Sequence, residues 1–354
     1  MPTACMISFR LGGGDGVSVE AAKWAGALRA LGWEVRTVAG AGPVDVLLPG
    51  LAIDATEPPT RAEVEDACAP ADLVVVENLC SLPLNPPAAA VVARVCAGRP
   101  ALFHHHDLPW QRPHLAHLPP PPDDPRWVHV TINELSRAEL AERGIAATTI
   151  YNTFDPEPTP GDRARTRAAL GVDNDEVLLL QPTRALARKN IAGALELTTG
   201  VGVGGTYWLL GPAEDGYGPE LDQLVARARC RVLQGPPPGG CSIADAYAAC
   251  DAVLLPSFWE GFGNPSVESA TYRRALAIGS YPVAAELAAF GFRWFGVTDP
   301  APLLGWLEHR DEGLLTHNQR VAAAHFNVAD LPARLAGVLA GTGVSWEGCD
   351  QSVT

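Results

Sequence analysis

Two glutamates eight positions apart flank a glycine-rich turn in residues 259–268, which read WEGFGNPSVE. The apolar run at 251–256 is long enough for a buried strand, and an asparagine and a proline after the glycines are typical of a helix start. Backbone N–H groups at such a turn suit phosphate, whereas Glu260 and Glu268 can accept hydrogen bonds from hydroxyl groups. The combination predicts a nucleotide-sugar pocket. An ordinary capped helix with two solvated acids is the alternative.

Two cations follow an earlier apolar run. Arg184 and Lys189 stand five positions apart, after residues 177–181 and before a helical stretch. Side chains at the carboxyl end of a parallel strand lie over the ligand crevice of an α/β domain. Arginine offers a bidentate fork and lysine a point charge, which together suit two phosphates. Most Arg-x4-Lys pairs are simply solvated, but the position of this one favours a diphosphate clamp.

A glycine loop at residues 12–16 directly follows the first expected strand. Glycines allow a ligand to approach the backbone where a Cβ would block it. The loop departs from the dinucleotide-binding fingerprint, because Val17 stands where the third glycine belongs and Glu34 opens the second strand instead of ending it. A nicotinamide cofactor is therefore disfavoured, and we predict no cofactor.

Three consecutive histidines, His104 to His106, end another buried strand and precede Asp107. Neighbouring side chains of a strand face opposite ways, so the three cannot easily chelate one ion, and no further Cys or His stands at ligand spacing. Asp173 and Asp175 match a D-x-D metal pattern but lie where a turn is expected. We therefore predict no metal. Core histidines bonded to the backbone are the alternative for the triple.

Strand-like and helix-like stretches alternate throughout, which predicts parallel α/β architecture. The expected strands lie near 4–9, 34–38, 45–48, 72–76, 100–104, 127–132, 177–181, 206–210, 230–234, 252–255, 276–279 and 294–297. A chain of 354 residues favours two domains, and the proline-rich stretch 155–162 suits a linker. Two doubly wound domains in tandem would place a ligand crevice between their carboxyl edges.

The composition excludes several classes of partner. Apolar residues make up 47% and charged residues 19%, as in globular proteins. With a net charge of −14 and no basic cluster, nucleic acid and anionic membrane surfaces are poor partners. No run approaches eighteen apolar residues and the amino terminus has no apolar signal core, so we expect no membrane span and no leader. The eight cysteines lie mostly in apolar segments, which suggests reduced thiols in a cytoplasmic protein.

In this order along the chain, the motifs resemble the retaining glycosyltransferases of family four, which carry an E-x7-E motif and have the GT-B fold of two Rossmann-like domains facing across a cleft. The resemblance covers nearly the whole chain and is strongest over 175–290. It departs from the common pattern at 263–265, Gly-Asn-Pro, and at Ser269. The segments 259–265 and 279–283 further resemble transferases that build mannosylated or glucosylated glycerate-type solutes.

The resemblance implies an acceptor-side domain at 1–156, a nucleotide-sugar domain at 157–328, and a C-terminal helix at about 329–345 that packs back on the first domain. The implied donor-binding residues are Gly13, Gly14, Arg184, Lys189, Gly261, Phe262, Gly263, Asn264, Pro265 and Glu268. The implied acceptor-side residues are Asp15, His105 and Asp107. His106, Glu260, Arg184 and Lys189 are the implied catalytic residues, with His104 or His105 as alternatives to His106.

The implied reaction transfers a hexose with retention, and without a metal, from a UDP-sugar or a donor of the GDP-mannose type to a hydroxyl group. We expect a small soluble acceptor, because the chain has no basic amphipathic stretch of the kind that lipid-modifying relatives use. The alternatives are a GT-B sugar-nucleotide epimerase, which needs further acid–base residues, and a non-catalytic carbohydrate- or nucleotide-binding relic, which should have lost part of the clamp. No feature indicates an oligomeric state.

Overall fold

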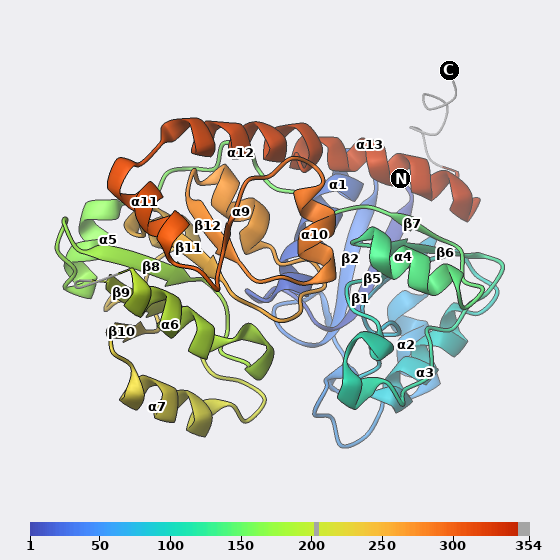
Figure 1. The fold of residues 1–354 in the computed structure, drawn as a ribbon. Coiled ribbons are helices and arrows are strands. Elements are labelled where there is room, and N and C mark those ends of the chain that lie inside the picture. The colour runs from blue at the N-terminus through green and yellow to red at the C-terminus, as the bar shows by residue number, and fades with distance from the viewer. Residues whose placement is uncertain (202–204, 346–354) are drawn as a thin grey trace. The chain divides into compact units, whose positions relative to one another are not determined.

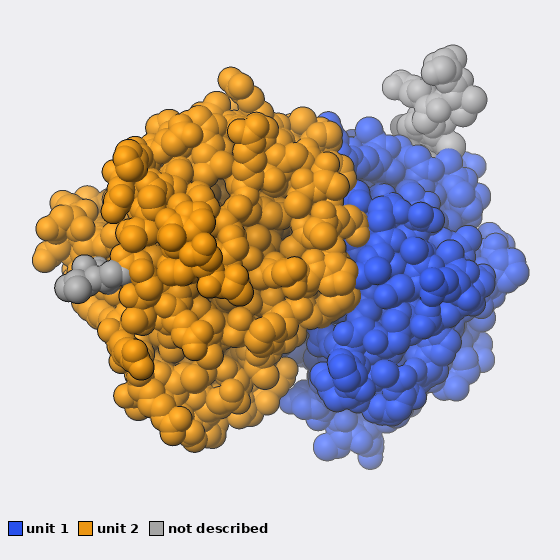
Figure 2. All heavy atoms as spheres, in the orientation of Figure 1, with its two compact units in different colours: residues 1–153, 328–354 blue, residues 154–327 orange. Residues whose placement is uncertain are grey.

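The computed structural model describes residues 1–201 and 205–345, which form two compact units (Figures 1 and 2). Unit 1 consists of residues 1–153 together with the C-terminal segment from Val328 on. Unit 2 consists of Phe154–Asn327. Within the described ranges, no helix combines the length and the apolar character needed to cross a bilayer.

Unit 1 is built on a seven-stranded sheet, in which every neighbouring pair of strands is parallel. Its order is β3-β2-β1-β4-β5-β6-β7. The strands are β1 (Thr3–Arg10), β2 (Glu34–Ala41), β3 (Val46–Leu47), β4 (Leu73–Glu77), β5 (Ala101–His105), β6 (Trp127–Thr131) and β7 (Ala147–Thr149). Strand order reverses between β1 and β4, and ligands of doubly wound sheets bind at the carboxyl ends beside such a reversal.

Helices cover both faces of this sheet (Figure 1). They are α1 (Gly16–Ala30), α2 (Arg61–Cys68), α3 (Pro86–Cys96), α4 (Glu134–Ala141) and α13 (Leu331–Leu339). On one face, Trp24 and Leu28 of α1 share a core with Leu331 and Leu335 of α13. On the other face, α2 and α3 pack on the sheet through residues such as Val92. The C-terminal helix α13 therefore completes the core of unit 1.

Unit 2 repeats the doubly wound plan with six parallel strands in the order β10-β9-β8-β11-β12-β13. The strands are β8 (Val177–Gln181), β9 (Gly205–Leu209), β10 (Arg231–Gln234), β11 (Ala252–Leu255), β12 (Ala275–Ile278) and β13 (Phe295–Gly296). The helices are α5 (Arg163–Leu170), α6 (Ile191–Gly200), α7 (Gly218–Arg227), α8 (Ile243–Ala249), α9 (Pro265–Thr271), α10 (Pro282–Ala288), α11 (Ala301–His309) and α12 (Glu312–His325). Here the reversal falls between β8 and β11, so their carboxyl ends form the expected ligand edge.

The predicted fold class, two parallel α/β units of Rossmann-like type, is confirmed. Each expected strand has a counterpart among the described residues, but β7 was not expected. It is a three-residue strand at the sheet edge that carries no apolar run. Seven of the eight cysteines lie in the described residues and are free thiols, and Cys349 lies outside them.

Candidate active site

A buried carboxylate, Glu260, lies between two cations at the ligand edge of unit 2. It stands in the loop after β11, whereas Arg188 and Lys189 belong to the 3-10 helix η4 (Ala187–Lys189) that follows β8. The Lys189 ammonium donates a hydrogen bond to Oε1 of Glu260, and Arg188 donates to Oε2 at 2.7 Å. Ser257 donates a further hydrogen bond to Oε1 at 2.5 Å. The two strands that flank the reversal thus supply one connected polar cluster.

The members of this cluster keep each other charged. Burial alone would raise the pKa of Glu260, but the Lys189 and Arg188 charges outweigh it and bring that pKa to about 2. Burial lowers the pKa of Lys189 to about 8, since the Glu260 charge only partly restores it and Arg188 repels a second cation. Near neutral pH two positive charges therefore face one negative charge, and the excess favours an anionic ligand.

Arg184 makes a separate ion pair. It donates to Glu214 at 2.5 Å, and the two side chains are 33% and 36% exposed. The predicted Arg-x4-Lys pair therefore has no common counter-ion, and Arg188, to which we assigned no role, is the cation that shares Glu260 with Lys189. An exposed ion pair is weak, so Arg184 can exchange Glu214 for a phosphate at little cost.

The turn before α9 is fixed by its neighbours. Gly263 has φ +82°, and a Cβ there would lie 2.7 Å from the Tyr281 hydroxyl oxygen, so only glycine fits. Phe262 is 3% exposed and its ring lies 6.1 Å from those of Phe154 and Phe326. Its side chain therefore packs in the core, which leaves only the backbone for the donor contact that the resemblance implies. Asn264 occupies the N-cap position and Pro265 the first position of α9, so the predicted helix start is confirmed.

Three further residues of the predicted donor site belong to this segment. Gly261 is partly buried and Pro265 is buried. The carboxylate of Glu268, on α9, accepts a hydrogen bond from the Tyr247 hydroxyl at 2.8 Å. Tyr247 is itself fully buried and stacks on Tyr272 with ring centroids 4.6 Å apart. Tyr247 thus fixes the orientation of Glu268, a contact that nothing in the sequence indicated.

In unit 1 the three histidines divide between the two faces of β5, as strand alternation requires. His104 and His106 converge on Oε2 of Glu77, the last residue of β4, with Nδ1 of His104 at 2.8 Å and Nε2 of His106 at 3.1 Å. Trp24 stacks on His104 with ring centroids 3.9 Å apart. Sequence reasoning missed Glu77, although an acid that ends an otherwise apolar strand is a usable signal.

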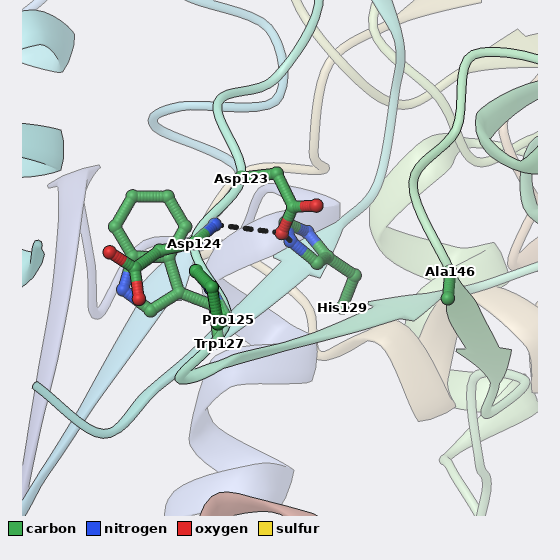
Figure 3. Close-up of a pocket in the computed structure, with 6 residues that line it drawn as sticks. All are labelled: Asp123, Asp124, Pro125, Trp127, His129 and Ala146. Carbon is green, nitrogen blue, oxygen red and sulfur yellow. Dashed lines mark hydrogen bonds and ion pairs between the residues drawn. The ribbon is translucent and has the colours of Figure 1, made fainter. Parts of the chain in front are cut away.

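His105 lies on the opposite face in a chain of hydrogen bonds. The Ser81 hydroxyl lies 2.6 Å from Nδ1 of His105, Nε2 of His105 lies 2.9 Å from Nδ1 of His129, and Nε2 of His129 lies 3.1 Å from Asp123. Asp123 and His129 line a pocket of about 280 Å³ together with Asp124, Pro125, Trp127 and Ala146. Figure 3 shows these six side chains. Both ring nitrogens of His105 are therefore occupied inside the protein, which disfavours its predicted acceptor-side role.

The remaining predicted residues of unit 1 lie in loops. Gly13 and Gly14 are exposed, and a Cβ at Gly14 would meet nothing within 4 Å. Asp15 caps α1 by accepting hydrogen bonds from the backbone N–H of Ser18 at 3.2 Å and from its hydroxyl at 2.8 Å. Asp107 forms an ion pair with Arg112 at 2.9 Å. Both acids thus have structural partners, whatever ligand they meet.

One group of described residues has the spacing of metal ligands. The ligand atoms of Glu77, His104 and His106 all lie within 4.8 Å of one another. The prediction of no metal rested on the absence of further Cys or His ligands, whereas here a carboxylate, Glu77, joins two histidines. Asp173 and Asp175 lie in the expected turn between α5 and β8.

No model of a known protein family matches the chain. The chain is 26% identical over 271 residues to the mannosylglucosylglycerate synthase of Petrotoga mobilis, a match that spans 62% of each protein. It is 25% identical over 386 residues to the mannosylglucosylglycerate synthase of Thermotoga maritima. This match spans 89% of this chain and 88% of the relative. It is also 33% identical over 141 residues to the D-inositol 3-phosphate glycosyltransferase of Actinosynnema mirum, 36% of this chain and 34% of that one.

Among solved structures, the Anabaena protein HepE in complex with UDP-glucose superposes with a TM-score of 0.73, over 96% of this chain and 99% of that one, at 21% identity. At that identity the likeness shows the fold. With glycosyltransferases as its relatives in sequence and this two-domain fold, the chain is a glycosyltransferase of the GT-B type.

Proposed function

We propose that the chain is a family-four transferase that moves a hexose, with retention, from a nucleotide sugar to a hydroxyl group of a small soluble acceptor. The observation that carries the proposal is the pair of buried residues Glu260 and Lys189, joined by the partly buried Arg188, at the ligand edge of unit 2. Buried groups with displaced pKa values gather at functional sites, and the excess of positive charge suits a diphosphate.

In this proposal the diphosphate of the donor binds Lys189, Arg184 and the backbone N–H groups of the turn at 261–264. As the bond between the anomeric carbon and the phosphate oxygen breaks, negative charge grows on the leaving diphosphate. Cations already held in place stabilise that charge without reorganisation, and losing one such group typically costs on the order of 10²–10³ in kcat. The protein's own cations would supply the charge that a metal supplies elsewhere.

Retention follows if the acceptor attacks from the face that the diphosphate leaves. The acceptor oxygen forms the new bond to the anomeric carbon, and its proton passes to an oxygen of the departing phosphate. Glu260 would accept hydrogen bonds from the sugar hydroxyls while its ion pairs hold it in place. Glu268, oriented by Tyr247, would accept from the ribose hydroxyls.

For the donor we propose a UDP-sugar or a sugar nucleotide of the GDP-mannose type, and for the acceptor a sugar acid. HepE was solved with UDP-glucose, and two relatives are mannosylglucosylglycerate synthases, in line with the resemblance of 259–265 and 279–283 to such enzymes. The net charge of −14 disfavours an acceptor held in an anionic membrane. Free thiols at the seven described cysteines suit the cytoplasm, where we propose that the enzyme acts.

A sugar-nucleotide epimerase is the second candidate. It needs acid–base groups, and the buried Glu77 and His106 pair in unit 1 offers them. Product analysis separates the two functions, because an epimerase changes the sugar on the nucleotide without any acceptor, whereas a transferase releases the nucleoside diphosphate only when it transfers the sugar.

Isothermal calorimetry with UDP, GDP, ADP and dTDP tests the donor site. We expect the protein to bind one of these, and Lys189→Ala to weaken that binding at least about tenfold, since a buried phosphate contact is lost. Arg231→Ala is the matched control, because it removes a cation of unit 2 that pairs with Glu176 on β8's amino-terminal side. If none of the four nucleotides binds, the proposal fails and a relic is favoured instead.

A further inference from the structure

The carboxylate of Glu77 determines which ring nitrogens of its two histidines carry protons. Glu77 is fully buried, and its Oε2 lies within hydrogen-bonding distance of both His104 and His106. An ionised carboxylate can only accept, so each imidazole must donate to it. His106 must therefore carry its proton on Nε2, and His104 must carry its proton on Nδ1.

The carboxylate remains ionised despite its burial. Burial alone would raise the pKa of Glu77, but the two histidines outweigh this and bring the pKa to about 2. Burial also lowers the pKa of His104, although Glu77 opposes that change. The arrangement near neutral pH is thus a fixed negative charge that accepts two N–H groups.

His106 is also held from its backbone. The N–H groups of His106 and Asp107 both donate to the side-chain oxygen of Asn78, at 3.1 and 3.2 Å. Asn78 directly follows Glu77 and has φ +59°, so the end of β4 is shaped to hold the end of β5. With its backbone and Nε2 both fixed, the ring has little freedom to turn.

The two histidines differ in what their second nitrogen meets. Nε2 of His104 is enclosed without a partner, beneath the Trp24 ring. Nδ1 of His106 also has no hydrogen-bond partner among the described residues, but it is not one of the enclosed polar atoms, and His106 retains 5% exposure. Nδ1 of His106 is therefore the atom that a ligand can reach.

We propose that Glu77 is a positioning residue of the transfer reaction, which holds His106 as the Nε2–H tautomer so that Nδ1 accepts a hydrogen bond from a substrate hydroxyl group. The proposal rests on the proposed function, in which His106 contacts the substrate. Without Glu77, the imidazole can turn over or move its proton to Nδ1, and the acceptor becomes a donor. The same logic orients catalytic histidines beside carboxylates in other enzymes.

A metal ion at this group is the competing arrangement. A histidine that binds a metal usually donates its other N–H to a carboxylate, a carbonyl or water. Nε2 of His104 has no such partner, whereas hydrogen bonds to Glu77 satisfy the nitrogens that face it. The hydrogen-bonded arrangement is therefore favoured, and zinc becomes an outcome of the test.

Nitrogen-15 NMR of the histidine side chains tests the tautomers in the unmodified protein, with the nine histidines labelled and His106 assigned from His106→Ala. We expect the pattern of an Nε2–H tautomer for His106, and its loss in Glu77→Gln. Asp123→Asn is the matched control, since it removes the carboxylate at the end of the His105 chain on the other face and should leave the His106 signal unchanged. An Nδ1–H tautomer, or joint shifts of His104 and His106 on adding Zn²⁺, would overturn the proposal.

A double-mutant cycle tests the link to the reaction. We expect Glu77→Gln to lower kcat about 10- to 100-fold, the range typical for a group that orients a site residue, with nucleotide binding unchanged. In a His106→Ala background it should have no further effect, because Glu77 acts through His106. If the effects of Glu77→Gln and His106→Ala on kcat multiply instead, Glu77 has a purely structural role. If the wild-type protein transfers no sugar but the tautomer is as expected, the proposed function fails and the orientation of His106 by Glu77 stands.

Discussion

At the residue scale, both units hold buried carboxylates that close partners keep ionised. Glu260 accepts from Lys189 and Arg188, and Glu77 accepts from two histidines. Such groups cost free energy when they leave water, and their partners restore it. The partner of each charge therefore matters as much as the charge itself.

Removing the negative charge of Glu260 should destabilise unit 2. Glu260→Gln leaves the buried Lys189 ammonium without the carboxylate that offsets its burial, so we expect the free energy of unfolding to fall by about 3 kcal/mol. Glu214→Gln is the matched control. It removes the partner of the exposed Arg184 and should cost no more than about 1 kcal/mol. Urea denaturation at pH 7 compares the two variants, and equal losses would contradict the burial argument.

The stability that Glu260 contributes should depend on pH. Its pKa is lowered in the folded protein, from the ordinary 4.5 to about 2, so the contribution is complete above pH 4.5 and is lost as the pH falls toward 2. A shift of this size corresponds to about 3 kcal/mol. Urea denaturation between pH 3 and 7 should therefore show the wild-type and Glu260→Gln curves converging in acid. A difference that does not change with pH would refute this.

At the element scale, short helices and turns that follow the strands position the residues of the candidate site. The helix α9, for example, has only seven residues, and its position depends on the turn before it. Gly263 occupies the left-handed region in that turn, and a Cβ there would meet the Tyr281 hydroxyl, so the turn requires glycine at this position. The elements thereby bring Glu260 and Glu268 to fixed places.

Two glycines should therefore respond differently to the same substitution. Gly263→Ala forces a Cβ against the Tyr281 hydroxyl at positive φ, and we expect it to cost about 2 kcal/mol in the free energy of unfolding. Gly14→Ala meets open space and should change that free energy by less than about 0.5 kcal/mol. If Gly14 contacts the donor as predicted, Gly14→Ala should instead weaken nucleotide-sugar binding in calorimetry. A stability loss at Gly14 comparable to that at Gly263 would contradict this assignment.

The sequence was informative about strands because buried parallel strands are apolar runs, such as 252–255. It was less informative about partners, since contacts such as Glu77 with His104 join residues 27 positions apart. The Tyr247 contact to Glu268 had no signal, because the two residues lie 21 positions apart on different helices. Edge strand β7 was missed because it buries too little to need an apolar run.

At the scale of the whole molecule, each unit has its own core, and the C-terminal helix α13 contributes to that of unit 1. Leu335 of α13 is fully buried in the same core as Trp24 of α1. Residues more than three hundred positions apart are therefore joined in one folding unit. Unit 2 is continuous in sequence between them.

Leu335→Ala should therefore destabilise unit 1, including residues far away in the sequence, and leave unit 2 unaffected. The cavity left in the core should cost about 3 kcal/mol, and hydrogen exchange should speed up in α1 and the strands of unit 1. Leu303→Ala, a matched change in the core of unit 2, should speed exchange in β8 and β9 instead. Hydrogen exchange with mass spectrometry reads both patterns, and a Leu335→Ala effect confined to unit 2 would contradict the division.

At this scale we propose that the chain transfers a hexose with retention and that the cations of unit 2 drive the transfer. The most direct test of this proposal is proton NMR of the product formed from an α-linked sugar nucleotide of the class that binds and a glycerate-type acceptor. We expect a product with the α configuration of the donor, formed by the wild-type protein at least about 10²-fold faster than by Lys189→Ala. A β-linked product, or release of free sugar without transfer, would contradict it.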